Sequence, residues 1–138
     1  MNTLQKHFVD TNIFIHTLFA IDTKKQEACI SLFEQASRGT YRLWSTEWVI
    51  AELVWFLTRQ KMKWSSIQLV IEKILVTKGL EIHGTTLVQH VLQECADSKH
   101  FNDGINIMLA RESGISKGFS YDKGIGKWEG FVRVEPNI

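Results

Sequence analysis

The sequence predicts an α/β domain with a mostly parallel central sheet of about five strands and helices on both faces. Short apolar runs alternate with helical patterns along the whole chain, an order typical of parallel sheets covered by helices. The length of 138 residues suits a single domain, and no repeat, low-complexity tract or change of composition divides residues 1–138. The single proline, Pro136, argues against a proline-rich linker or a disordered tail.

The first half of the chain contains two expected strands and three expected helices. Apolar runs predict strands at 7–9 and 41–44. Helical periodicity predicts helices at 13–21, 24–38 and 46–60. Gly39 is expected to end the second of these helices, and Ser45 to cap the start of the third.

The second half contains three further helices and three further strands. Helical patterns predict helices at 65–78, 86–97 and 102–113. Apolar runs predict strands at 80–83, 115–120 and 131–135. Two capping boxes and two terminating glycines mark the helix ends: Ser65 with Gln68, Thr86 with Gln89, Gly79 and Gly114.

The charge balance excludes two classes of protein. Sixteen Lys and Arg residues against 15 Asp and Glu residues give a net charge of +1 at pH 7. The chain is therefore neither a strongly basic nucleic-acid coat nor an acidic solvating tail. The balance does not show where the individual charges lie.

Cysteine usage and hydropathy predict a cytoplasmic protein. Cys29 and Cys95 lie far apart in apolar helical stretches, which favours two buried free thiols in a reducing cytosol over a metal site. The N-terminal residues lack the basic and uninterrupted apolar regions of a signal peptide. The longest apolar run, at 48–57, is broken by Glu52 and is too short to cross a bilayer of about 30 Å, so no membrane segment is expected.

One aspartate directly follows a predicted strand, and a second comes two residues after the end of another. Asp10 stands in Phe8-Val9-Asp10-Thr11-Asn12, and Asp122 stands in Phe119-Ser120-Tyr121-Asp122-Lys123. In open parallel sheets the functional crevice lies beyond the carboxyl ends of the strands, so both are expected at that edge. Each could instead only cap a turn or a helix, where Asp is favoured. The presence of both at one edge favours a functional role.

Glu52 is predicted to be buried at the centre of the apolar face of the helix at 46–60. At about 100° per residue, Trp48 and Trp55 fall on one side of Glu52 and further apolar residues fall on the other. Because an ionised carboxylate is costly to bury without a partner, a cation should meet it. Glu47 lies roughly 140° from Glu52 and is expected to be an ordinary solvent-facing charge.

Asp103 opens the helix at 102–113, which is apolar almost all round and therefore expected to be buried. An alternative role is a first-turn residue that complements the helix dipole, with Asn102 as the cap. Four carboxylates in one crevice cannot all ionise near neutral pH without a compensating cation: Asp10, Glu52, Asp103 and Asp122. All-oxygen ligands suit hard ions such as Mg²⁺ or Mn²⁺, which supports metal-assisted phosphoryl chemistry.

At these residues the chain resembles a PIN-domain ribonuclease, and in particular the VapC-type toxins of prokaryotic toxin–antitoxin pairs. The resemblance covers essentially the whole chain and rests on four segments in this order: Val9-Asp10-Thr11-Asn12, Ala51-Glu52-Leu53, Asp103-Gly104 and Ser120-Tyr121-Asp122-Lys123. It implies a three-layer α/β/α PIN-like domain. Two features depart from the family pattern: Gly104 stands where members usually have Ala, and Lys117 and Gly118 interrupt a strand that is typically apolar.

The resemblance implies a metal-dependent endoribonuclease. The family's acidic metal-binding and catalytic quartet is matched by Asp10, Glu52, Asp103 and Asp122. Asn12 and Ser120 match polar residues that commonly support this quartet, and Thr11 is placed with them. One or two Mg²⁺ or Mn²⁺ ions would activate a water for in-line attack on an RNA phosphodiester, giving a 5′-phosphate and a 3′-hydroxyl. The implied partners are RNA, a cognate antitoxin and a second copy of the chain in a homodimer.

The lysines after Asp122, the histidines and two alternative functions complete the predictions from the sequence. Lys123 and Lys127 are candidates for contacts with the RNA backbone, with solvated loop lysines as an equal alternative. The five histidines show no metal-ligand spacing, and His16 and His100 are expected nearest the crevice. The alternative function is a non-catalytic PIN-like module that binds RNA or protein. A haloacid-dehalogenase-like phosphatase is disfavoured because Asn12 stands where its second Asp is needed.

Overall fold

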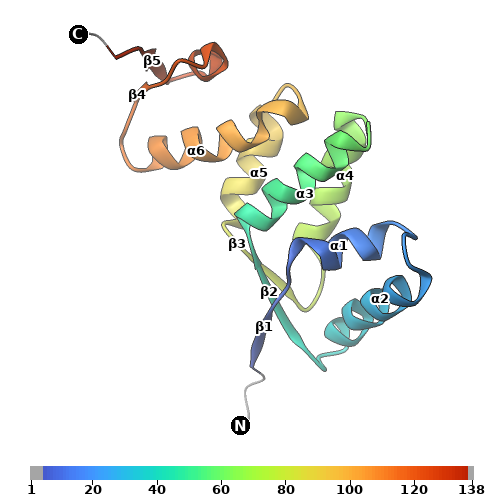
Figure 1. The fold of residues 1–138 in the computed structure, drawn as a ribbon. Helices are drawn as coiled ribbons and strands as arrows, with labels where there is room; N and C mark the ends of the chain where they lie inside the picture. Colours follow the sequence, from blue (N-terminus) through green and yellow to red (C-terminus); the bar gives the residue numbers. More distant parts are fainter. Residues whose placement is uncertain (1–4, 137–138) are drawn as a thin grey trace. The chain divides into compact units, whose positions relative to one another are not determined.

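Parallel strand pairs dominate the structure, as the alternation of strand and helix patterns predicts. The computed structural model describes residues 5–136, which form two units, one ending at Thr85 and the other beginning at Thr86 (Figure 1). Within these residues the first unit has a three-stranded sheet and the second a two-stranded sheet, and every strand pair is parallel. The α/β fold class is confirmed, and the predicted five strands are present but divided between two sheets.

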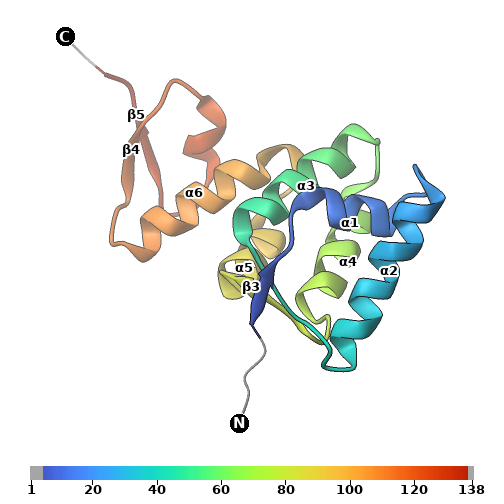
Figure 2. The ribbon, with the colours of Figure 1, turned by 60° about the horizontal axis from the view of Figure 1, so that its bottom comes forward.

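The first unit contains three strands and four helices. In chain order they are β1 (Lys6–Phe8), α1 (Thr11–Leu18), α2 (Thr23–Ser37), β2 (Arg42–Thr46), α3 (Glu47–Arg59), α4 (Trp64–Leu75) and β3 (Leu80–His83). The strand order is β1-β2-β3, with Phe8 opposite Trp44 and Thr46 opposite His83. Both connections lead to the next parallel strand in the same direction across the sheet. Figure 2 shows α1, α2 and α4 together on one side of these strands.

The core of the first unit forms where the apolar helix faces meet. Ile67 and Ile71 recur at helical spacing on α4 and are fully buried, as are Leu53 and Leu57 on α3. Burying side chains of this size contributes about 1.5–3 kcal/mol each, which stabilises α3 and α4 far more than their intrinsic propensities do.

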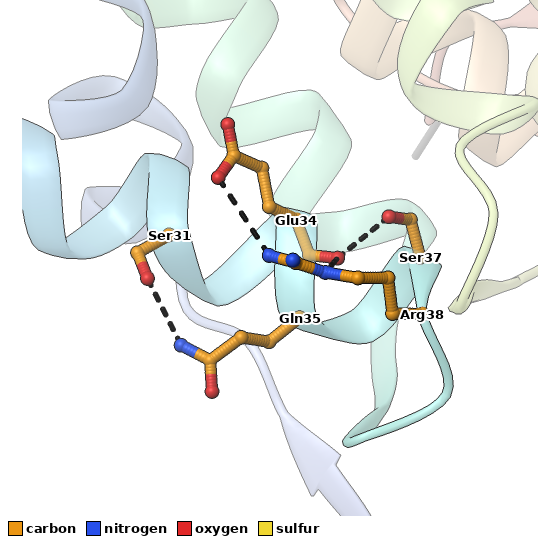
Figure 3. Close-up of polar contacts among 5 residues, drawn as sticks. All are labelled: Ser31, Glu34, Gln35, Ser37 and Arg38. Carbon is orange, nitrogen blue, oxygen red and sulfur yellow. Dashed lines mark hydrogen bonds and ion pairs between the residues drawn. The ribbon is translucent and has the colours of Figure 1, made fainter.

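Side chains of α2 form hydrogen bonds within the last turns of the helix. The hydroxyl of Ser37 donates to the carbonyl oxygen of Glu34 at 2.6 Å, and the Gln35 amide donates to the hydroxyl of Ser31 at 2.9 Å (Figure 3). Gly39 follows with a φ of +87°, a conformation that side chains disfavour. The predicted end of this helix at Gly39 is therefore confirmed.

The second unit is smaller and contains two short 3₁₀ helices that the sequence patterns did not indicate. Its elements are α5 (Thr85–Glu94), which starts at the unit boundary, η1 (Ser98–His100), α6 (Phe101–Glu112), β4 (Lys117–Phe119), η2 (Lys123–Lys127) and β5 (Val132–Val134). Its core contains Val88, Val91, Phe101 and Ile105. β4 pairs in parallel with β5 even though Lys117 and Gly118 interrupt its apolar pattern, and the Phe131 ring occupies the space that a Cβ on Gly118 would need.

Four predicted helix caps are wrong. Ser45 does not cap α3, because its buried hydroxyl donates to the carbonyl oxygen of Val9 at 2.8 Å. The cap is Thr46, whose hydroxyl accepts from the Val49 amide at 3.2 Å. The other three predicted caps lie inside their helices: Ser65 in α4, Thr86 in α5 and Asn102 in α6.

Packing explains the early start of α6. Phe101 precedes the predicted cap and is fully buried, so burial of its ring extends the helix by one residue. Three helices also end three residues earlier than predicted: α1 ends at Leu18, α4 ends at Leu75, well before Gly79, and α5 ends at Glu94.

The two cysteines are free and buried, as predicted. Burial raises the pKa of the Cys29 thiol. Burial also raises the pKa of the Cys95 thiol, to about 12, with a further contribution from the negative charges of Asp97, Asp103 and Glu94. No helix within residues 5–136 is both long enough and apolar enough to cross a membrane.

Candidate functional site

Asp10 stands at the point where β1 passes into α1. The preceding residue, Val9, is buried and forms two hydrogen bonds with β2. Its amide donates to the Trp44 carbonyl oxygen at 2.8 Å, and its carbonyl oxygen accepts from the Ser45 hydroxyl. Asp10 itself is exposed and has extended backbone angles, and its Oδ1 accepts from the Thr11 amide at 2.8 Å. The strand therefore fixes the position of this carboxylate, which also caps α1, so the capping role is confirmed.

Thr11 links Asp10 to Glu52. Its side chain is buried, and its Oγ1 donates to Glu52 Oε2 at 2.6 Å. The start of α1 thus holds a carboxylate from the middle of α3, 41 positions away along the chain. Each of these hydrogen bonds engages one carboxylate oxygen and fixes the orientation of the group.

The predicted burial of Glu52 is wrong. Glu52 is exposed, on the same side of α3 as Trp48 and Trp55, which are 48% and 55% exposed. The buried face is centred near Ile50, roughly 160° from Glu52 at 100° per residue. A hydroxyl group, that of Thr11, contacts the carboxylate in place of the cation that the burial argument required.

The prediction for Glu47 is also wrong. Its side chain is buried, and its Oε2 lies 2.8 Å from Nδ1 of His83, the last residue of β3. The backbone of Gly84 has a φ of +77° and passes so close that a Cβ there would lie 2.7 Å from the same oxygen. Local spacing in the sequence does not predict this contact. It arises because β2 pairs in parallel with β3, which places Thr46 opposite His83.

In the second unit, Asp103 and Asp122 act on each other electrostatically. Asp103 lies in the first turn of α6 and is partly buried. Burial raises the pKa of its carboxyl, and the negative charge of Asp122 raises it further, while His100 lowers it. The predicted proximity of His100 to the acids is therefore confirmed for this pair. Repulsion between two carboxylates favours a proton or a metal cation near Asp103.

Asp122 is held by a turn of the backbone. Its Oδ1 accepts from the Gly124 amide at 2.9 Å, which makes it the cap of η2. Its own amide donates to the Ser120 hydroxyl at 3.0 Å, and the Ser120 carbonyl oxygen accepts from Arg133 at 3.0 Å. Ser120 therefore supports the backbone at Asp122.

The remaining predicted residues are exposed. Asn12 lies in the first turn of α1, and Lys123 and Lys127 are the first and last residues of η2. The glycine-containing segment that carries these lysines is thus a short 3₁₀ helix. His16 is partly buried, and its Nδ1 has no hydrogen-bond partner within the described residues.

Each unit therefore supplies a pair of carboxylates. In the first unit the pair is joined through Thr11, and in the second it is coupled by charge. Among residues 5–136, no group of three or more His, Cys, Asp or Glu side chains is gathered in a way that could hold a metal ion. The donor chemistry of both pairs fits a hard divalent cation, because carboxylate oxygens are its preferred ligands and Asp103 gains from added positive charge.

Comparison with known proteins identifies one family. The family model for the PIN domain matches residues 7–128, which include all four carboxylates and parts of both units. No curated protein matches the chain significantly.

Proposed function

Because the chain belongs to the PIN domain family, we propose that it is a Mg²⁺- or Mn²⁺-dependent endoribonuclease that hydrolyses RNA phosphodiester bonds. PIN domains are generally nucleases. The observation that carries the proposal is the carboxylate pair of the second unit, where burial and the charge of Asp122 raise the pKa of Asp103. A bound divalent cation would relieve this repulsion, which is what a metal-dependent nuclease requires.

The metal ligands in this proposal are the four predicted carboxylates: Asp10, Glu52, Asp103 and Asp122. Mg²⁺ or Mn²⁺ held by these carboxylates would supply an activated water for hydrolysis and positive charge to offset the charge that develops on the phosphodiester. The products would carry a 5′-phosphate and a 3′-hydroxyl. The proposal includes the prediction that the two units work as a single domain, residues 1–138.

Other residues of the chain orient these ligands and the substrate. The Thr11 hydroxyl donates to Glu52, and the Thr11 amide donates to Asp10, so one residue directs two carboxylates. Ser120 supports the backbone at Asp122. Lys123 and Lys127, both exposed, would neutralise phosphates of the RNA backbone, and Asn12 would add a polar group beside Asp10.

The biological setting is proposed from the sequence resemblance. The length and the order of the four acidic segments resemble VapC-type proteins, which supports a toxin of a type II toxin–antitoxin pair that binds a cognate antitoxin and forms a homodimer. Two buried free thiols support a cytoplasmic location. We expect a small reading frame next to the gene that encodes an antitoxin. Co-expression of this antitoxin should neutralise the nuclease.

The endoribonuclease proposal is tested with Asp10→Asn. Asn caps a helix as well as Asp does, so the fold should be kept while a metal ligand is lost. Cleavage of RNA in Mg²⁺ or Mn²⁺ should fall by at least about 10²-fold, because the charge on the transition state is then poorly stabilised. Excess EDTA should abolish cleavage by the wild type.

The matched control is Asp22→Asn. Asp22 is the N-cap of α2 as Asp10 is of α1, although it accepts from the amide three positions on, that of Lys25 at 3.1 Å, and not from the next amide. This variant should cleave RNA as the wild type does. Equal cleavage by Asp10→Asn, or cleavage that survives EDTA, would refute the metal-dependent mechanism. RNA binding by the wild type without any cleavage would instead favour the non-catalytic PIN-like module.

A further inference from the structure

A pocket lies within the second unit, beside the residues that hold Asp122. Its volume is about 330 Å³, and it is lined by Glu94, Ala96, His100, Gly124, Lys127, Trp128 and Glu129. Gly124 donates its amide to Asp122 Oδ1 at 2.9 Å, and His100 acts electrostatically on Asp103. Two of the lining residues therefore contact or act directly on the acidic pair of this unit.

Trp128 forms an aromatic wall of this pocket. Its ring packs against the backbone of α6 at Gly104, where an added Cβ would lie 2.7 Å from Cη2 and 3.1 Å from Cζ2. The departure of Gly104 from the usual alanine therefore has a structural reason, since only glycine leaves room for the indole. Trp128 is partly buried, so one part of its ring is fixed against α6 while it also lines the pocket.

A lysine and a histidine line the pocket beside its aromatic ring, together with two glutamates. Lys127 is exposed and cationic, and His100 is partly exposed. Of the two lining carboxylates, Glu94 is paired with Arg111 at 3.1 Å, and Glu129 lies at an exposed position. An aromatic side chain beside a lysine is a common arrangement for binding an unstacked nucleotide, with the base on the ring and the phosphate on the cation.

We propose that this pocket binds one unpaired nucleotide of the RNA substrate, with its base stacked on Trp128 and its phosphate paired with Lys127. The volume is at the lower end of the range for small-ligand sites, which suits a single nucleotide. The inference rests on the proposed endoribonuclease function and makes Trp128 a residue that positions the RNA. The packing of Trp128 on Gly104 connects the bound base to the helix that carries Asp103.

The proposal is tested by calorimetric titration with the four nucleoside 5′-monophosphates and with ribose 5-phosphate, which lacks a base. EDTA is present throughout, so no cleavage occurs. The wild type should bind at least one nucleotide about 5- to 150-fold more tightly than ribose 5-phosphate, because stacking one base on an aromatic ring has this effect. Trp128→Leu should remove this difference, and Lys127→Gln should weaken both kinds of ligand.

Three controls keep the result interpretable. Trp55→Leu removes an exposed tryptophan from α3 and should bind like the wild type. Trp128→Phe keeps an aromatic ring and should retain part of the preference, which covers the case in which Trp128→Leu does not fold. A short single-stranded RNA should displace the nucleotide from Asp10→Asn, as expected if the pocket serves RNA.

Four results would overturn the proposal. The first is that the wild type binds no nucleotide up to about 10 mM, and the second is that it binds ribose 5-phosphate as tightly as the nucleotides. The third is that folded Trp128→Leu keeps the wild-type preference for nucleotides over ribose 5-phosphate. The fourth is that RNA cannot displace the bound nucleotide. Because these titrations need no catalysis, their failure leaves the endoribonuclease proposal standing. Conversely, nucleotide binding by a protein that never cleaves RNA would support the pocket and refute the nuclease.

Discussion

The two carboxylate pairs are stabilised in different ways. In the first unit, Asp10 and Glu52 accept hydrogen bonds from the amide and the hydroxyl of Thr11, at 2.8 and 2.6 Å. In the second unit, Asp103 is partly buried and lies near the like charge of Asp122, which together raise the pKa of its carboxyl. Neutral donors thus direct the first pair without any metal, whereas a bound cation would relieve the repulsion in the second pair. We therefore expect variants of the first pair to change geometry and variants of the second to change electrostatics.

Among variants that keep all four carboxylates, the largest expected effect comes from removing the Thr11 hydroxyl. Thr11→Val keeps the shape of the side chain but loses the hydrogen bond to Glu52. A group that orients a metal ligand typically contributes 10- to 100-fold, so Mg²⁺-dependent RNA cleavage should fall by about that factor. Thr11→Ser retains the hydroxyl and should cleave RNA at nearly the wild-type rate. Equal rates for the Val and Ser variants would show that orientation by Thr11 has no role.

A smaller effect, on stability alone, is expected at Glu47. Its buried carboxylate contacts His83, so Glu47→Ala should lower the free energy of unfolding by about 1–3 kcal/mol in urea denaturation. RNA cleavage per folded molecule should be unchanged, because Glu47 is not among the proposed ligands. The control is Glu34→Ala. Glu34 and Arg38 form an exposed ion pair at 4.0 Å (Figure 3), so this change should cost no more than about 0.5 kcal/mol.

The smallest expected effect separates the two pairs directly. Burial and Asp122 raise the pKa of Asp103 in the folded protein, so the folded state binds this proton more tightly than the unfolded state does. The ionised carboxylate therefore lowers stability as the pH rises through the folded pKa. At neutral pH without metal, Asp103→Asn should raise the melting temperature by about 2 °C, and the gain should vanish near pH 3, where Asp is protonated.

Asp10→Asn is the counterpart for the first pair. Asn can accept the same hydrogen bond from the Thr11 amide, so the metal-free melting temperature should stay at the wild-type value. Adding Mg²⁺ should raise the melting temperature of the wild type and raise that of both variants less. The expected difference between the two pairs would be contradicted if Asp10→Asn raised the metal-free melting temperature and Asp103→Asn left it unchanged.

Much of the fold follows from local patterns in the sequence. The strand at Leu80–His83 is confirmed at both ends, and the ends of α2 and α6 next to Gly39 and Gly114 follow from the positive φ that glycine allows. The positions of Asp10 and Asp122 shortly after β1 and β4 were also predictable, because a strand end is visible in a short apolar run. Helix starts were predicted less well, since a capping residue such as Ser45 can form its hydrogen bond with a distant strand instead.

By itself, the sequence determined the order of the elements, the parallel α/β class and the acids that follow the strands. Tertiary structure decided which side of α3 is buried, because that helix carries apolar residues nearly all round and its periodicity fits more than one face. Packing of Leu53 and Leu57 placed Glu47 inside and left Glu52 at the surface beside Thr11. The contact of Trp128 with Gly104 likewise depends on two segments meeting in space, which no local spacing can encode.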